Sequence, residues 1–134
     1  MKTFTATQLK SIRSLAAEFH LELVLLFGSR ARGKAHETSD VDLAVLAAHR
    51  LTIKEFLALQ GRLQDIIGIP VDLVDLKTAP VLLGDRITRD AMVIVGNTKT
   101  FSRLRSKLHI RYMDFQPIFQ RQQDRLYRQF GVTQ

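Results

Sequence analysis

Apolar residues recur at two different periods in the first part of the chain, and the two periods distinguish helices from strands. From Thr7 onward apolar side chains return every three or four residues, which predicts a helix whose first turn a hydroxyl residue can cap. Residues 23–27 are apolar throughout and end at Gly28, which predicts a short central strand. Residues 40–47 alternate between apolar and other side chains and predict a second strand.

The following segments continue this alternation of elements. Residues 52–67 show helical spacing, residues 71–76 form an apolar strand, and residues 81–90 and 92–95 predict a further helix and a short strand. A short helix is also expected directly after Gly28. Helices and strands therefore alternate along the chain, which predicts an α/β (α+β) fold with helices flanking a mixed sheet of about four strands.

Composition limits the class of protein. A chain of 134 residues has the length of one domain with a single core. It has no cysteine, which excludes disulfides and thiolate metal sites. Neither a membrane-spanning run nor a secretory signal is visible in the sequence, so we expect a soluble protein of the cytoplasm without a membrane partner.

Positive charge is concentrated at the C-terminal end. Residues 98–134 contain eight Lys or Arg and two Asp, a net charge of +6, whereas residues 1–97 contain 12 basic and 11 acidic side chains, a net charge of +1. The same segment has an apolar stripe at helical spacing that Pro117 interrupts, which predicts two helical pieces that must dock on something. We therefore divide the chain into a domain at 1–97 and a basic helical tail at 98–134, which serves for docking or oligomerisation.

The segment after the first strand has the properties of a phosphate-binding turn. Gly28 and Ser29 follow directly on that strand and open the expected short helix, so that backbone N–H groups and the Ser29 hydroxyl can face a phosphate. Arg30 and Arg32 add positive charge nearby. Together these residues form a candidate nucleotide site.

Carboxylates on two strands are candidates for metal binding. Asp40 and Asp42 are two residues apart on a predicted strand, so they share a face and can bind one or two Mg²⁺ ions through hard oxygen ligands. A third carboxylate can come from Asp72 or Asp75 on the later strand. These two are three residues apart and point to opposite faces, so only one of them can join the site.

Both halves of this pattern match a known signature. The stretch Gly28 to Gly33, five further residues and then Ser39 to Leu43 resemble the motif of the minimal nucleotidyltransferases of the DNA polymerase β superfamily. The resemblance implies that Gly28 and Ser29 hold the phosphates of ATP, with Arg30, Arg32 and Ser39 as further nucleotide-binding residues. It also implies that Asp40, Asp42 and Asp72 are the catalytic residues and hold Mg²⁺ in a two-metal site.

The resemblance also indicates an acceptor. Small members of this family are commonly antitoxins paired with a HEPN-type toxin, and some transfer AMP to a tyrosine hydroxyl of that toxin. We therefore expect a protein adenylyltransferase that uses ATP as donor and acts as antitoxin, with the tail at 98–134 as the surface for an acidic partner or for self-association.

Two other functions use the same residues. A small-molecule nucleotidyltransferase of the aminoglycoside type would need an acidic pocket for a cationic substrate, whereas the surplus charge here is basic. A non-catalytic antitoxin or binding module would keep the fold and a vestigial nucleotide site. Binding of nucleic acid by the tail is a weaker alternative, because no aromatic-rich surface accompanies the positive charge.

Overall fold

Four strands and four helices make up the described part of the protein, which in this computed structural model covers residues 4–28, 30–31 and 40–130. In chain order the elements are α1 (Ala6–Glu18), β1 (Leu21–Phe27), β2 (Val41–Ala47), α2 (Ile53–Ile67), β3 (Val71–Asp75), α3 (Val81–Asp90), β4 (Met92–Val95) and α4 (Thr98–Phe130). The strands form one sheet in the order β3-β2-β1-β4. Only β2 and β3 run parallel, and the other two pairs are antiparallel.

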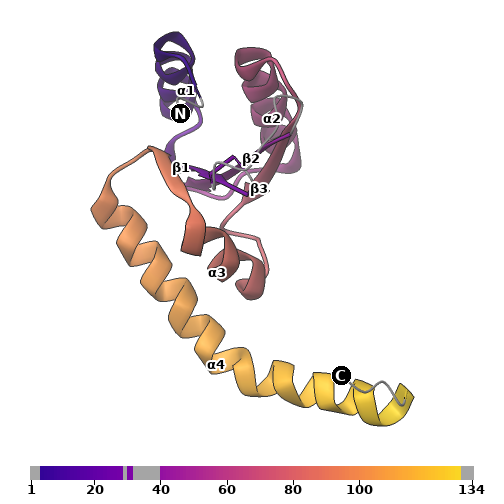
Figure 1. Ribbon diagram of the computed structural model, residues 1–134. Coiled ribbons are helices and arrows are strands. Elements are labelled where there is room, and N and C mark those ends of the chain that lie inside the picture. Colours follow the sequence, from indigo (N-terminus) through magenta and orange to yellow (C-terminus); the bar gives the residue numbers. More distant parts are fainter. Residues whose placement is uncertain (1–3, 29, 32–39, 131–134) are drawn as a thin grey trace.

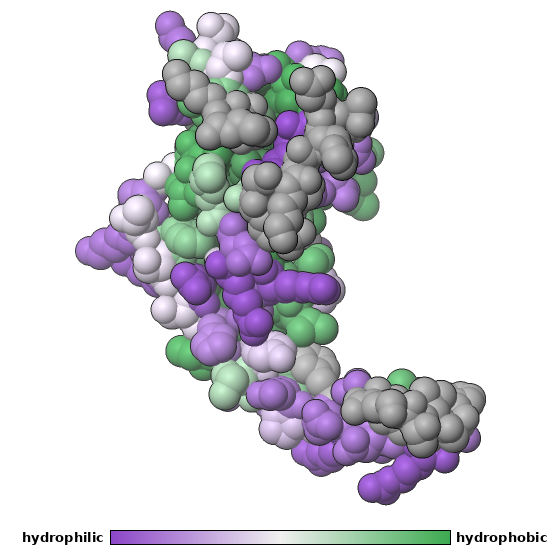
Figure 2. Space-filling model, viewed as in Figure 1, coloured by the Kyte–Doolittle hydropathy of each residue, from purple (hydrophilic) through white to green (hydrophobic). Residues whose placement is uncertain are grey.

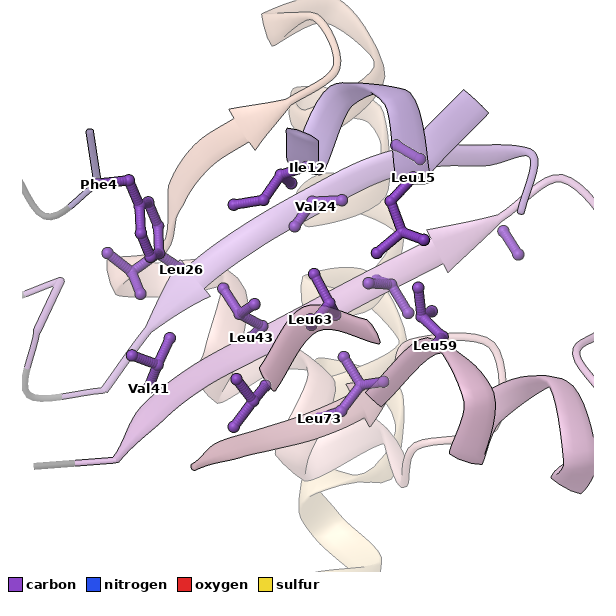
Figure 3. Packing of buried hydrophobic residues seen from close by; sticks show 14 of the residues in the cluster. Phe4, Ile12, Leu15, Val24, Leu26, Val41, Leu43, Leu59, Leu63 and Leu73 are labelled. Atoms are coloured by element: carbon purple, nitrogen blue, oxygen red, sulfur yellow. The ribbon is translucent and has the colours of Figure 1, made fainter. Parts of the chain in front are cut away.

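One face of the sheet is covered by α1 and α2 (Figure 1). The alternate residues of the strands that point to this face are buried against the two helices, as Figure 3 shows for Val24, Leu43 and Leu73. Two glutamines of α2 connect this helix to β3, since the Gln60 side chain donates to the Val71 carbonyl at 2.8 Å and Gln64 accepts from the Val71 N–H at 3.0 Å. These contacts hold the beginning of β3 against α2.

Both helices on this face begin with a capping box. In α1 the pair is Thr5 and Gln8, and in α2 it is Thr52 and Glu55, each side chain accepting from the other residue's backbone N–H. The N–H of Thr52, assisted by its side chain and by His49, holds the pKa of Glu55 below its ordinary value. The cap of α2 is therefore stronger when Glu55 is ionised.

The opposite face of the sheet carries a second, smaller core. Leu23, Leu25 and Ala44 are buried there against Ile87 of α3. The first turns of α4 join this cluster through Phe101 and Leu104, and Leu108 is buried against Gly84 of α3. The beginning of α4 is thus part of the folded core.

Beyond this region α4 leaves the core (Figure 1). The sequence predicted a break at Pro117, and this prediction is wrong, because a single helix of 33 residues runs through that proline. Figure 1 shows a bend near the middle of α4, which agrees with the backbone hydrogen bond that a proline cannot donate. Figure 2 shows mostly hydrophilic residues on the visible face of its far half.

The observed fold confirms the predicted class, a mixed four-stranded sheet flanked by helices with a C-terminal helix. The short helix expected after Gly28 lies largely outside the described residues. Within the part of the chain that the structure describes, no helix is both long enough and apolar enough to cross a bilayer.

Candidate functional site

Two aspartates from neighbouring strands lie side by side at one end of the sheet. Asp42 of β2 pairs directly with Asp72 of β3 in the parallel register. Residues paired in this way point to the same face of a sheet, so both carboxylates lie on the face that carries α3 and α4. On the other side of β2, Asp42 pairs with Phe27, the last residue of β1.

Gly28 follows Phe27 and brings its backbone against the Asp42 carboxylate. It has a φ of 76°, a conformation that favours glycine over residues with a side chain. A Cβ atom at this position would collide with Oδ2 of Asp42. Position 28 therefore requires glycine for two independent reasons, and the end of β1 lies directly beside the carboxylate.

The register also separates the two candidates for the third carboxylate. Asp72 shares the face of Asp42, whereas Asp75 has the opposite parity and pairs with Val45. The Asp75 side chain accepts from the backbone N–H of Lys77 at 3.0 Å. Asp75 is the last residue of β3, and its side chain holds the turn that follows on the side of α2, so it is not part of the cluster at Asp42.

The remaining predicted site residues are only partly placed. Asp40 lies immediately before β2 and is exposed, and Arg30 is half-buried just after the turn at Gly28. The predictions for Ser29, Arg32 and Ser39 lie outside the described residues.

Asp42 and Asp72 offer the hard oxygen ligands that Mg²⁺ prefers, and their register places them on one face. The described residues contain no group of three or more acidic, histidine or cysteine side chains arranged to hold a metal ion. Asp40 therefore does not complete such a group with them in this structure. The pair would fit a Mg²⁺ ion whose further ligands would be water or the phosphates of a bound nucleotide, and Asp40 would have to approach the pair to join them.

A cavity opens next to Gly28 on the same face of the sheet. Its volume is about 290 Å³, and it lies between the end of β1 and α3. The lining residues are Phe27, Gly28, Leu83, Arg86, Ile87 and Asp90. The four from α3 recur at the spacing of one helical face, a pattern that is visible in the sequence but was not singled out there.

The other face of α3 contains a buried acid that the sequence did not reveal. Asp85 is 2% exposed and accepts from Arg89 at 2.8 Å. Its second oxygen lies 3.3 Å from Nδ1 of His109 on α4, and Arg89 lies over the ring of Tyr112. This network ties α3 to α4 and thereby holds the helix that lines the cavity.

The fold agrees with what comparison with known families shows. The family model described as Polymerase beta, Nucleotidyltransferase matches residues 10–100, which is more than half of the chain. The chain therefore belongs to the polymerase beta nucleotidyltransferase family. The matched region contains the whole sheet, both aspartates and Gly28, and it ends near the beginning of α4.

A curated relative named as a protein adenylyltransferase matches part of the chain. Protein adenylyltransferase MntA of Shewanella oneidensis is 37% identical over 76 residues, which are 57% of this chain and 55% of that protein. The chain thus matches about half the length of this relative.

Two solved structures share the fold over more of the chain. A chain in a crystal structure of a toxin–antitoxin with AMP-PNP has a TM-score of 0.80 and 29% identity, and the match covers 88% of this chain and 97% of that chain. A chain in the structure of a tri-AMPylated Shewanella oneidensis HEPN toxin in complex with MNT antitoxin has a TM-score of 0.74 and 26% identity, and here the match covers 89% and 95%.

Proposed function

We propose that this protein is a metal-dependent nucleotidyltransferase that transfers AMP from ATP to a hydroxyl group of a partner protein. The partner is a HEPN-type toxin, the acceptor is a tyrosine, and the transfer makes this chain the antitoxin, acting in the cytoplasm. The observation that carries the proposal is the register of Asp42 with Asp72, beside a turn at Gly28 whose backbone conformation favours glycine. The adenylyltransferase relative and the AMPylated toxin complex support the choice of donor and acceptor.

The transfer requires one bond to form and one to break. The acceptor oxygen attacks the α-phosphorus of ATP, and the bond from that phosphorus to the oxygen bridging to the β-phosphate breaks, so that pyrophosphate leaves. Asp72 is exposed at the edge of the site and accepts the proton of the acceptor hydroxyl. Backbone N–H groups around Gly28 and the Arg30 side chain hold the phosphates in line for the attack.

Mg²⁺ is the metal that suits the ligand set. Asp42 and Asp72 would hold it, together with Asp40, because all three supply hard carboxylate oxygens. When bound, the ion would neutralise charge that develops on the transferring phosphoryl group. No nitrogen or sulfur ligand is needed for this role.

The far part of α4 is proposed as the surface that binds the acceptor protein. The helix face that packs on the core through Leu104 and Leu108 continues beyond it with Phe115 and Leu126, which are 42% and 54% exposed. On this far part Arg121, Arg125 and Arg128 line a cavity of about 460 Å³ that contains a single acidic residue, Asp124. An acidic partner with an apolar stripe would match this surface in charge and hydrophobicity.

Covalent labelling tests the proposed activity. The protein is incubated with α-labelled ATP, Mg²⁺ and the HEPN partner, and the partner is then examined for a nucleotide adduct by mass spectrometry. We expect label on a tyrosine of the partner with the wild-type chain and none with Asp42→Asn. Label on neither protein would contradict the transfer, and label on a cationic small molecule instead would favour the aminoglycoside-type alternative.

The same variant separates catalysis from binding. If the chain neutralises its partner by modification, Asp42→Asn should lose neutralisation while it still binds the partner. If neutralisation survives in Asp42→Asn, the non-catalytic binding module is the better description. Affinity for the partner, measured by calorimetry for both chains, provides the control.

A test of docking by α4 requires a truncated chain that keeps the folded core intact. Removing all of residues 98–134 would delete Leu104 and Leu108 from the folded core, so loss of binding would have no clear cause. A chain ending at Asp114 keeps these contacts and removes the exposed part of the helix. We expect it to keep the fold and to bind the partner at least about tenfold more weakly, and unchanged affinity would contradict the proposed surface.

A further inference from the structure

The network of Asp85, Arg89, His109 and Tyr112 lies apart from the chemistry described so far. Asp85 is on the face of α3 opposite the cavity at Gly28, and its side chain is buried where α3 meets α4. A buried carboxylate is costly unless its oxygens have partners. Here Oδ2 accepts from Arg89 at 2.8 Å, and Oδ1 lies 3.3 Å from Nδ1 of His109. An ionised carboxylate only accepts, so Nδ1 of His109 must carry the hydrogen in this contact.

The network extends over one turn of each helix. Asp85 and Arg89 are four residues apart on α3, and His109 and Tyr112 are three apart on α4, so each pair lies on one face of its helix. The Arg89 guanidinium lies 5.5 Å from the centroid of the Tyr112 ring, and the rings of His109 and Tyr112 are stacked at 6.4 Å. The two helices are therefore joined at successive turns and not at a single point.

Among the described residues, this network is also the last attachment of α4 to the domain. Leu108 is buried against Gly84, and Tyr112 is half-buried. From Met113 on, every residue whose burial the structure describes is exposed. Residues 113–130 form a helical arm about 27 Å long, and Figure 1 shows the arm extending away from the sheet. A tilt of about 10° at the network would move the end of this arm by about 5 Å.

We propose that Asp85 is a positioning residue for adenylyl transfer, because the network that it anchors fixes the direction in which α4 leaves the domain. The proposal rests on the proposed function, since it takes the far part of α4 to bind the acceptor protein. The contact of Leu108 with Gly84 is apolar and has little directional preference, whereas hydrogen bonds to a charged group are directional. The apolar contact holds the two helices together, and Asp85 sets the angle between them.

Transfer depends on this direction because the reacting atoms must be aligned. The acceptor hydroxyl has to approach the α-phosphorus in line and to about 3–3.5 Å, and a misplacement of about 1 Å can cost about 10²-fold in rate. An acceptor bound to the arm moves with the arm, whereas Asp42 and Asp72 are held by the sheet. A loosened network should therefore lower kcat for transfer while the docking surface and the nucleotide site keep their affinities.

Substitution of His109 opens the network without placing a new group in the core. The His109 side chain is 55% exposed, so His109→Leu should fold normally while it removes the donor to Asp85. His109→Asn keeps an N–H near the position of Nδ1 and is the conservative variant. Arg105→Leu is the matched control, because Arg105 is exposed on the same helix and has no hydrogen bond or ion pair with the described part of the chain.

The first readout is the direction of α4, which does not depend on the proposed activity. The chain contains no cysteine, so spin labels can be attached to Lys54→Cys on α2 and Gln120→Cys on α4, two exposed positions. Double electron–electron resonance then measures the distribution of distances between the labels. We expect His109→Leu to broaden this distribution or to shift its mean by about 3 Å or more, whereas His109→Asn and Arg105→Leu should match the wild type.

The second readout separates kcat from binding. We expect kcat for AMP transfer to the acceptor protein to fall about tenfold or more in His109→Leu, while the Kd values for the acceptor and for Mg²⁺-ATP change less than about threefold. His109→Asn should restore most of the rate, and Arg105→Leu should keep the wild-type rate. Unchanged kcat in His109→Leu would overturn the positioning role, and so would an unchanged distribution of distances.

A variant of Asp85 itself completes the test. Asp85→Leu replaces the buried carboxylate with an apolar group of similar volume, and it should reproduce the loss of kcat seen in His109→Leu. The double variant should be no slower than either single variant, because both changes remove the same contact. Losses that multiply in the double variant would overturn the proposal, since the two residues would then act separately.

Failure of the proposed function would look different. If the wild-type chain transfers no AMP to the acceptor, the proposed function fails, and the role of Asp85 in transfer fails with it. If the wild type is active and His109→Leu has the same kcat, only the positioning role is overturned.

Discussion

Two regions of the protein differ in how far their residues are buried and held in place. One is the end of the sheet at Asp42, and the other is the far half of α4. At the sheet, strand register and a positive-φ glycine fix each group, and the residues behind the site are buried. In α4, apolar residues such as Ile118 and Leu126 remain exposed among arginines. Precise chemistry requires the first arrangement, whereas recognition of another molecule requires the second, because only an unburied surface can bind a partner.

The largest predicted effect is on the rate of adenylyl transfer, and it should differ between the two aspartates of β3 because they lie on opposite faces of the sheet. Asp72→Asn removes the proposed base and metal ligand, and we expect the rate of adenylyl transfer to fall about 10³-fold or more. Asp75→Asn, which lies on the other face, should change the rate less than about threefold. Single-turnover transfer from labelled ATP measures both, and equal losses would mean that strand parity does not define the site.

Two alanine variants of α4 test where this helix stops being part of the folded core. Leu108 is 5% exposed and packs against Gly84, so Leu108→Ala should lower the free energy of unfolding by about 2–4 kcal/mol. Ile118 is 43% exposed, and Ile118→Ala should change it by less than about 0.5 kcal/mol. Urea unfolding of the two variants provides the comparison. A large loss in Ile118→Ala would show that the far half of the helix is folded onto the domain.

Much of the site could be predicted from the sequence because it depends on local rules. Alternation places Asp42 and Asp72 on strands, and parity allows only one of Asp72 and Asp75 to share the face of Asp42. The family resemblance selected Asp72, and the observed register places Asp72 on that face. The roles of these residues, like those of Ser29 and Arg32, remain predictions. Tertiary contacts were not predictable in this way: Asp85 is an ordinary acid in the sequence, and only the approach of α4 makes it a buried partner of His109.

The C-terminal segment shows the limit of a local rule. A proline inside a helix costs about 3 kcal/mol, which predicts a break at Pro117. The long helical segments on both sides outweigh this cost, and the result is one bent helix instead of two pieces. The beginning of that helix is held by the core through Phe101 and Leu104, which a division by charge alone did not reveal.

Substitution of Gly28 tests whether the close approach of the turn to the Asp42 carboxylate is needed for activity. Gly28→Ala must place a Cβ at a φ of 76° and against Asp42, so the carboxylate has to move, and we expect transfer to slow about 10- to 100-fold. The control is Gly61→Ala in the middle of α2, where no heavy atom lies within 4 Å of the added Cβ. This variant should stabilise the protein by about 0.5–1 kcal/mol and leave the rate unchanged. Normal activity in Gly28→Ala would contradict the requirement for glycine.

The smallest predicted effect is on the pH dependence of the free energy of unfolding, which should differ between the N-terminal caps of α2 and α4. Because folding lowers the pKa of Glu55, its ionised form stabilises α2 above the pKa of the unfolded chain, and this stabilisation is lost as the pH falls through the folded pKa. Glu55→Gln cannot titrate, so the stability advantage of the wild type should be present at neutral pH and shrink in the acidic range. Urea unfolding at a series of pH values measures this difference.

The cap of α4 provides the control for that experiment. Asn97 accepts from the backbone N–H of Thr100 at 2.7 Å, and an asparagine carries no charge at any of these pH values. Asn97→Ala should therefore lower the free energy of unfolding by about 1 kcal/mol, and the loss should be similar at neutral and acidic pH. If Glu55→Gln behaves in the same pH-independent way, the capping box of α2 does not depend on the ionised carboxylate. If it behaves as expected, acid weakens the sheet-bound helix α2 at its cap while the cap of α4 is unaffected.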